Sequence, residues 1–449
     1  MRRTGSVAVM LVIGLLGSLI LLPLQVSLVP LLMPESPASE NMVVRAQELY
    51  SPWNRTFGGS DPDIGFGVVE VSSGGFACVG ETQSSGAGDS DVWLVRTTAD
   101  GSPLWSQTFG GLYSESGHVV LEVSTGGFAI AGYMQSIDTW SDDIWLLRIG
   151  TSGNLLWNKT FGGLSRDRCE SLVEVSSGGF ALAGTTEYEG TVSGDFWLIR
   201  TTGAGAHLWN QTYGGTAQEV CEAMIEVDAG GFLMAGWTTS IGFGAADAWL
   251  VRTDANGNLL WSRNYGAKLN DKIYAVTEVS TGGFLLLGAT RSYSVGETDV
   301  WVIRTDAFGN MVWNQTFSGP GYDDGRSVVE LSTGEFALLA TTTSYGAGGI
   351  DVWLLITNST GNQLWNQTYG GTDHELGYQL TTVSTGGFAI IGYTRSYGAG
   401  QHDLWLLHVT TIGLIPPVSF ELFVVLIGTL IVITTVGVIY VYRRRTAII

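Results

Sequence analysis

Four short apolar runs separated by turn residues recur along the chain. In residues 115–163 they are Val119–Val123, Phe128–Tyr133, Ile144–Ile149 and Leu155–Phe161. Runs of this length and composition are typical of β-strands, and the Ser-Thr-Gly-Gly and Gly-Asn segments between them are hairpin signals. Because the runs are apolar at consecutive positions, both faces of each strand should be covered. The pattern predicts a four-stranded antiparallel sheet buried on both sides.

This unit is repeated seven times with a period of 52 residues. Two series of tryptophans follow the period, Trp53, Trp105, Trp157, Trp209, Trp261, Trp313 and Trp365, and Trp93, Trp145, Trp197, Trp249, Trp301, Trp353 and Trp405. Four strands in a repeat of this length describe one blade of a propeller. We therefore predict an all-β fold, a seven-bladed β-propeller over residues 53–411. A linear β-solenoid is the alternative.

The order of the runs predicts how the ring closes. The first copy of the fourth run, Trp53–Phe57, precedes every copy of the first run, and no fourth run follows the last third run, Leu404–Val409. An N-terminal strand that completes the last blade would remove the exposed edges from the ring. A solenoid would not need this leftover strand.

One segment of the unit carries a family resemblance. Residues 252–261 read RTDANGNLLW, which resembles the tryptophan-docking motif of quinoprotein-like propellers, where an Asp, a Gly and a Trp lock successive blades together. The whole unit is similar to the β-propeller repeat of bacterial and archaeal surface proteins. The resemblance implies the fold and a surface location. Quinoprotein enzymes usually have eight blades and a vicinal cysteine pair, and this chain has seven repeats and no adjacent cysteines.

Both ends of the chain are apolar and predict a membrane-anchored protein. Arg2 and Arg3 precede an apolar run, and Ser36-Pro37-Ala38 is a small-residue cleavage site, so residues 1–38 are predicted to be a signal peptide or an uncleaved signal anchor. Residues 422–442 contain no charge and are followed by three arginines, which predicts a transmembrane helix over 420–442 and a cytoplasmic tail over 443–449. Linkers are expected at 39–52 and 412–419, and the propeller is expected outside the cell.

Charge and composition argue against two classes of protein, disordered chains and nucleic-acid-binding proteins. The chain is 45% hydrophobic with a net charge of −20, which excludes a disordered chain and argues against a nucleic-acid partner. One acidic column follows the repeat just before the first run of each unit: Asp63, Glu115, Asp167, Glu219, Asp271, Asp323 and Glu375. These carboxylates are predicted either to cap loops through backbone amides or to form a ring around the axis that holds Ca²⁺ or a cationic ligand. No other cofactor is expected.

Two further sets of residues fit an exported protein. Cys169 and Cys221 occupy equivalent positions in neighbouring units, where an inner-strand radius of about 7 Å brings the Cα atoms about 6 Å apart, so they are candidates for a disulfide or for two buried thiols. The N-glycosylation sequons are Asn54, Asn158, Asn210, Asn314, Asn358 and Asn366. Most of them share one repeat position, so Trp-Asn-x-Thr is alternatively a structural preference of that strand.

The loops between the second and third runs suggest where a ligand binds. They differ in every unit and carry aromatic residues, namely Tyr188, Phe243, Tyr293, Tyr345 and Tyr397. Variable loops on a rigid scaffold are typical of binding surfaces. We expect a cell-surface binding or adhesion module for an extracellular protein or glycan. The alternatives are a structural component of the cell envelope and a hydrolase or lyase at the channel mouth, which unit-specific polar residues near the axis would indicate; the candidates are Arg166, Arg168, Lys268, Lys272 and His374.

Overall fold

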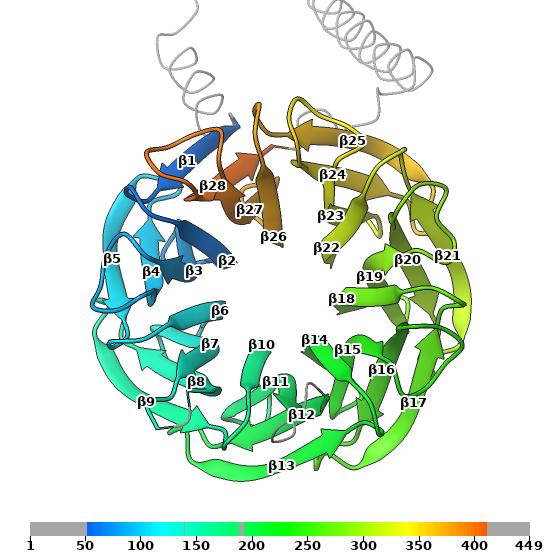
Figure 1. Ribbon diagram of the computed structural model, residues 1–449, viewed down its shortest axis with the longest axis horizontal. Helices are drawn as coiled ribbons and strands as arrows, with labels where there is room; N and C mark the ends of the chain where they lie inside the picture. Colours follow the sequence, from blue (N-terminus) through cyan, green and yellow to red (C-terminus); the bar gives the residue numbers. More distant parts are fainter. Residues whose placement is uncertain (1–51, 139, 188–192, 411–449) are drawn as a thin grey trace, which may run out of the picture. The chain divides into compact units, whose positions relative to one another are not determined.

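The computed structural model describes residues 52–138, 140–187 and 193–410, which form seven four-stranded antiparallel sheets arranged in a ring (Figure 1). The predicted seven-bladed β-propeller is thereby confirmed. The predicted signal segment, transmembrane helix and basic tail lie outside the described residues. Among the residues that are described, no helix is long and apolar enough to cross a membrane.

Each blade consists of strands A to D, counted outward from the axis. The A strands are β2 (Asp63–Glu70), β6 (Glu115–Glu122), β10 (Asp167–Glu174), β14 (Glu219–Glu226), β18 (Asp271–Glu278), β22 (Asp323–Glu330) and β26 (Glu375–Thr382). The B strands are β3 (Phe76–Thr82), β7 (Phe128–Gln135), β11 (Phe180–Glu187), β15 (Phe232–Thr238), β19 (Phe284–Thr290), β23 (Phe336–Thr342) and β27 (Phe388–Thr394). The C strands are β4 (Asp91–Thr97), β8 (Asp142–Ile149), β12 (Gly194–Thr201), β16 (Asp247–Thr253), β20 (Asp299–Thr305), β24 (Asp351–Thr357) and β28 (Asp403–Val409). The D strands are β5 (Pro103–Phe109), β9 (Leu155–Phe161), β13 (His207–Tyr213), β17 (Leu259–Tyr265), β21 (Met311–Phe317), β25 (Gln363–Tyr369) and β1 (Trp53–Phe57).

The ring closes as the order of the runs predicts. The N-terminal strand β1 pairs with β28 and completes the sheet β1-β28-β27-β26. Strand A, in contrast, starts earlier than its apolar run: β6 begins at Glu115 instead of Val119. The added residues include Ser116, Gly117 and His118, which carry no apolar signal because the innermost strand faces the axis on one side.

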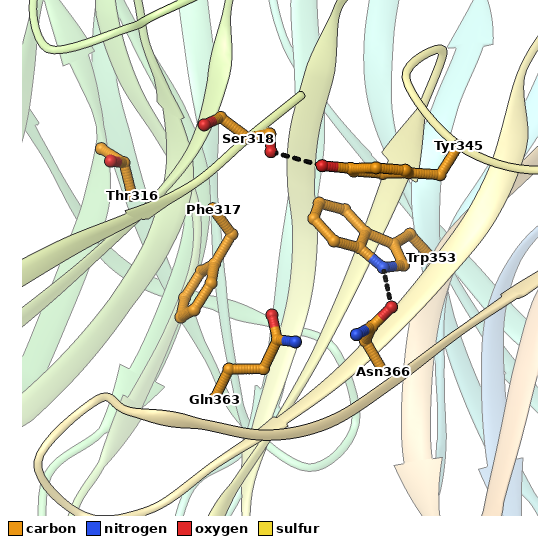
Figure 2. A pocket seen from close by; sticks show the side chains of 7 residues that line it. All are labelled: Thr316, Phe317, Ser318, Tyr345, Trp353, Gln363 and Asn366. Atoms are coloured by element: carbon orange, nitrogen blue, oxygen red, sulfur yellow. Dashed lines mark hydrogen bonds between the residues drawn. The ribbon is translucent and has the colours of Figure 1, made fainter. Parts of the chain in front are cut away.

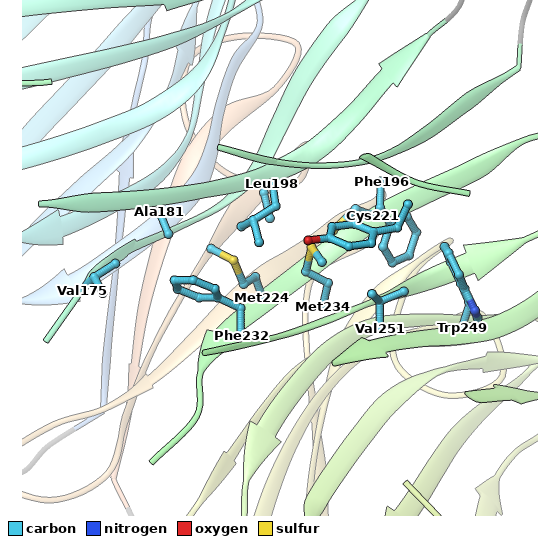
Figure 3. Packing of buried hydrophobic residues seen from close by; sticks show 12 residues of the cluster. Val175, Ala181, Phe196, Leu198, Cys221, Met224, Phe232, Met234, Trp249 and Val251 are labelled. Carbon is cyan, nitrogen blue, oxygen red and sulfur yellow. The ribbon is translucent and has the colours of Figure 1, made fainter. Parts of the chain in front are cut away.

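The core lies between blades. Strands B and C are buried at nearly every position, and each apolar cluster joins two neighbouring sheets. In the cluster of Figure 3, Phe196 of β12 packs on Trp249 of β16 with ring centroids 4.7 Å apart, and Met224 and Met234 fill the space beside them. Both faces of each sheet are therefore covered, which is why the runs are apolar at consecutive positions.

Tryptophans on the D strands dock each blade onto the next. A Cβ on Gly257 would lie 2.7 Å from the ring of Trp209, and the Tyr213 hydroxyl donates to Gly257 O (2.5 Å). The glycine of the motif thus receives the tryptophan of the preceding blade. Trp261, four residues beyond Gly257, packs instead against Gly309 of the following blade.

Glutamates at the ends of the A strands form a second lock between blades. Glu122 accepts hydrogen bonds from Ser72 N and Ser72 Oγ of the preceding blade, both at 2.7 Å. Glu174, Glu226, Glu278, Glu330 and Glu70 bind the equivalent turns. The seventh position is Thr382, for which the structure records no such bond.

Candidate functional site

The acidic column forms loop caps. All seven carboxylates belong to residues that are at most 3% exposed, and each accepts a hydrogen bond from the backbone N–H four residues earlier, over 2.6 to 3.1 Å. The B strand supplies further donors, for example Thr238 Oγ1 to Glu219 (2.7 Å). One oxygen of each carboxylate therefore caps its own connection, while Asp63 Oδ1 and Asp167 Oδ1 are buried without a hydrogen-bond partner in the described part of the chain. Among the described residues, no three His, Cys, Asp or Glu side chains come together as metal ligands.

The loops between strands B and C lie on the same face as the connections from D to A. Ser90 of one loop pairs with Ser114 of the following connection, and Glu115 N donates to Ser90 O (2.8 Å). Several of the loop aromatics hold this structure together. The Tyr345 hydroxyl donates to Ser318 O (2.7 Å), and its ring lies over Trp353 at a pocket of about 380 Å³ (Figure 2). This tyrosine is therefore occupied in packing and is not a free contact residue.

Two other loop tyrosines make the same kind of hydrogen bond as Tyr345, and the remaining loop aromatics differ. Tyr293 and Tyr397 donate to Gly266 O and Gly370 O (3.2 and 3.1 Å), in the manner of Tyr345. Phe243 is 84% exposed, and Tyr188 lies outside the described residues. Trp140, in the loop between β7 and β8, is 67% exposed. Of the described loop aromatics, Phe243 and Trp140 are thus the most available to a partner.

The sequon asparagines of the D strands bind tryptophans. Trp145 Nε1 donates to Asn158 Oδ1 (3.3 Å), and the same bond joins Trp197 to Asn210, Trp301 to Asn314 and Trp353 to Asn366. Asn54 is exposed, and Asn358 Oδ1 accepts from the backbone of its own turn. The repeated Trp-Asn pair therefore has a structural role, whether or not the exposed amides carry glycans.

The two candidate disulfide cysteines are buried and free. Cys169 Sγ lies 3.3 Å from Ser171 O, and Cys221 Sγ lies 3.8 Å from Ala223 O, each within its own blade. The predicted disulfide is not formed in this structure, because each thiol is directed to a carbonyl of its own A strand. Burial raises the pKa of Cys169 to about 12, which keeps the thiol protonated.

A β-bulge in every A strand defines a different site. The pairing between strands A and B skips one residue in each blade, for example Glu170 between Cys169 and Ser171. The skipped residues are Phe66, His118, Glu170, Glu222, Tyr274, Arg326 and Tyr378. We call these seven residues the bulge belt. Bulges redirect side chains and are frequent beside functional sites, and here they add unit-specific chemistry to an otherwise repeated strand.

The members of the belt contact one another around the axis. His118 Nδ1 is 2.8 Å from Glu170 Oε2 of the next blade. On the other side of His118, Phe66 stacks against it and against Tyr378, with centroids 5.0 and 4.9 Å away. The Arg326 guanidinium lies over the Tyr274 ring at 4.8 Å. Since these residues belong to different blades, the contacts establish that the belt faces the axis.

The electrostatics of the belt favour proton exchange near neutral pH. Burial raises the pKa of Glu222 to about 7, and the charge of Glu170 adds to the shift. Burial alone would lower the pKa of His118, but the charge of Glu170 and the hydrogen bond to it outweigh burial, so the net shift is upward. The belt thus holds an imidazole oriented by a carboxylate, and a second carboxyl that titrates near 7.

A second position at which the residue type differs from blade to blade lies two residues before the belt on each A strand. Arg168 binds Asp142 (2.7 Å) and covers the Tyr133 ring at 4.6 Å. Lys272 Nζ lies 4.0 Å from the Trp237 ring centroid. Asp324 is fully buried and binds Arg326 (2.7 Å). These side chains extend the polar surface of the belt toward the face that carries the D-to-A connections.

Two of the basic residues that the sequence marked as candidates belong to the surroundings of the belt. Arg168 and Lys272 stand on A strands beside the belt, whereas Arg166, Lys268 and His374 lie in the connections before them. The belt itself was missed, although one signal was present: its column contains five residue types in seven copies, while the column three residues earlier is acidic in every copy.

The fold and the belt together define a seven-bladed propeller with a unit-specific site at its axis. No protein-family model and no curated protein sequence matches the chain. Among solved structures, it is similar to a puromycin hydrolase, with a TM-score of 0.49 and 12% identity over 82% of this chain and 53% of that one. It is also similar to the Pan2 WD40 domain of Neurospora crassa (TM-score 0.47, 9% identity, 78% and 89% covered) and to YCF48 bound to D1 peptide (0.46, 10%, 80% and 95%). At these identities the likeness is one of fold alone.

Proposed function

We propose that this protein is a membrane-anchored cell-surface binding module whose ligand site is the bulge belt and the loop face above it. One observation carries the proposal: the residues that differ from blade to blade meet at one level around the axis. A ligand without sevenfold symmetry requires different side chains in different blades, whereas blade stability does not. The two apolar ends of the chain support the anchored location, and the expected ligand is an extracellular glycan or protein.

An array experiment with belt variants tests this function. The purified full chain is applied to arrays of glycans and proteins, with and without Ca²⁺. Binding should be lost in Glu170→Gln and Tyr378→Leu, because both side chains belong to the belt. Thr381→Val is the matched control, since it lies on the same strand β26 beyond the belt. Retention of all binding in both belt variants, together with its loss on replacement of the B-to-C loops, would move the site to those loops.

Hydrolysis or elimination of the bound ligand is a second candidate function. The observation that favours it is that the belt holds two groups of the kind that general acid and base chemistry uses. They are His118, whose imidazole is oriented by Glu170, and Glu222, whose pKa burial raises to about 7. Each ligand identified on the array is incubated with the protein, and the products are separated. Measured at saturating ligand, Glu222→Gln should stop turnover, because the amide cannot exchange a proton. A ligand recovered intact after prolonged incubation leaves binding as the whole function.

A further inference from the structure

The basic residues of the described propeller fall into three groups with different roles. Five on the C strands bind turn carbonyls: Arg96, Arg148, Arg200, Arg252 and Arg304. Three lie on the outer D strands: Arg55, Lys159 and Arg263. The third group lies on A strands, in D-to-A connections or at the start of B-to-C loops: Arg166, Arg168, Lys268, Lys272, Arg291, Arg326 and Arg395. In a strongly acidic protein, the cations of this third group thus gather around one mouth of the ring.

Two cations of this third group share a pocket and have no acidic partner. Lys272 and Arg291 line a pocket of about 200 Å³ together with Asn270, Tyr274, Thr298 and Tyr322. Among the described residues, no carboxylate oxygen lies within 4.0 Å of either cation, whereas Arg168, Arg326 and Arg395 are each paired with an aspartate. No acidic residue lines the pocket. Burial lowers the pKa of Lys272, and the charges of Glu222 and Asp324, which lie outside the lining, oppose that shift. Since neither carboxylate reaches ion-pair distance of Lys272 or Arg291, the pocket favours an anion.

The neutral groups of the pocket are hydroxyls and one amide. Burial raises the pKa of Tyr322 to about 12, and burial also raises the pKa of Tyr274, so both phenols keep their protons at neutral pH. Thr298 and Asn270 add further donors and acceptors. A ligand that brings hydroxyls as well as a negative charge can pair with these groups, whereas an acidic peptide side chain would leave them unpaired.

We propose that this pocket is an acidic-sugar subsite that binds the carboxylate of a uronic acid residue. The inference rests on the proposed function, because the pocket shares Tyr274 with the bulge belt. Lys272 and Arg291 bind the carboxylate, and Tyr274, Thr298 and Asn270 bind ring hydroxyls; the Tyr322 hydroxyl, which donates to Asp324 (3.0 Å), keeps an oxygen that can accept. The volume is small compared with pockets for drug-sized ligands, which fits a single sugar unit at the end or side of a larger glycan.

Calorimetric titration of the full chain with glucuronate, glucose and N-acetylglutamate tests the subsite. Glucuronate should bind at least tenfold more tightly than either of the other two compounds. Lys272→Gln and Arg291→Gln should each weaken glucuronate binding at least tenfold, while Lys268→Gln, an exposed cation outside the pocket lining, should change it less than twofold. Thermal unfolding checks that the variants remain folded; Arg291 is exposed, so its substitution tests the site without disturbing the core.

Four results would overturn the subsite. Glucose that binds as tightly as glucuronate would remove the role of the charge, and N-acetylglutamate that binds as tightly would favour an acidic peptide. Absent glucuronate binding, or binding unchanged in both pocket variants, would reject the pocket itself. If Glu170→Gln still abolishes binding of the array ligands, the proposed function of the belt stands without the subsite. If binding of the array ligands does not depend on the belt residues, the proposed function itself is wrong.

Discussion

Thr382 interrupts a lock that six other joints between blades possess. In those joints a glutamate at the end of strand A accepts the backbone N–H of the preceding blade's turn, and in five of them also a serine hydroxyl, at 2.6 to 2.9 Å. At the seventh joint the turn donor is present: Ser332 is exposed, and its turn closes with the same backbone bonds as the others. Thr382→Glu should therefore complete the lock.

The expected gain is about 1 kcal/mol. Two hydrogen bonds to a carboxylate contribute together about 2 to 3 kcal/mol. Ordering a partly exposed glutamate costs up to about 2 kcal/mol, and replacing threonine in a strand costs a few tenths of a kcal/mol. With an unfolding entropy of ~2.1 cal/mol/K per residue over about 350 residues, a gain of about 1 kcal/mol raises Tm by roughly 1.4 °C.

Differential scanning calorimetry of a four-protein cycle measures this gain. Wild type, Thr382→Glu, Ser332→Ala and the double variant are compared at one pH. Ser332→Ala should be neutral in the wild type and should remove about half of the gain in the Thr382→Glu background, because the serine hydroxyl has an acceptor only there. Glu330→Thr, at the preceding joint, should lower Tm by a similar amount. A gain that is unaffected by Ser332→Ala, or no gain at all, would refute the reasoning.

Three further predictions concern the core and the carboxyl groups. Burial raises the pKa of Asp167 to about 6 and that of Glu222 to about 7, above their unfolded values of 3.8 and 4.5. The stability that these groups contribute is therefore complete below the unfolded values and is lost as pH rises toward 7. The urea midpoint of unfolding should fall between pH 5 and 7.5, less steeply in Asp167→Asn, and a midpoint that rises would contradict this. Gly309→Ala should cost at least about 1 kcal/mol more in urea unfolding than Gly334→Ala, because both glycines have positive φ but only the Cβ at 309 meets Trp261; equal costs would argue against the docking contact. Burial raises the pKa of all three thiols, so Ellman's reagent should label no thiol in the native protein. It should label three thiols in protein that is unfolded in urea without a reductant. A single labelled thiol in that unfolded protein would indicate a disulfide between Cys169 and Cys221.

The propeller could be predicted from the sequence because its determinants are local and repeated. The Gly-Gly-Phe turn and the tryptophan on each D strand each have one structural meaning, and the 52-residue period repeats them without interruption; the leftover strand Trp53–Phe57 adds the closure of the ring. The start of strand A was missed, because Ser116, Gly117 and His118 show neither an apolar run nor an alternation. A strand that faces the axis has no need of that pattern on its inner side.

The site could be predicted only in part, because it depends on the bulge and on contacts between blades. Nothing in the spacing of Cys169, Glu170 and Ser171 indicates which of the three is skipped in the pairing with β11. The acidic column left two alternatives open for the opposite reason, since uniform carboxylates fit both a set of loop caps and a ring. The structure shows the caps: Asp63 and its equivalents each accept a backbone N–H of their own connection.

In a symmetric fold, repeat positions that are uniform and repeat positions that vary between blades have different roles. A residue type that occurs in all seven blades serves the blade or the joint, since that is all that the blades share. At the belt, Tyr378 and Phe66 form an aromatic arc, and Glu170 and Glu222 form an acidic one on β10 and β14. Lys272 follows on β18, and Arg326, which is paired with Asp324, lies on β22. Such an order offers a ligand one apolar edge, one proton-exchanging edge and one basic edge. A ligand that binds on the axis must then be asymmetric in the same sense, with its negative charge toward β18 and β22 and its apolar edge toward β26 and β2.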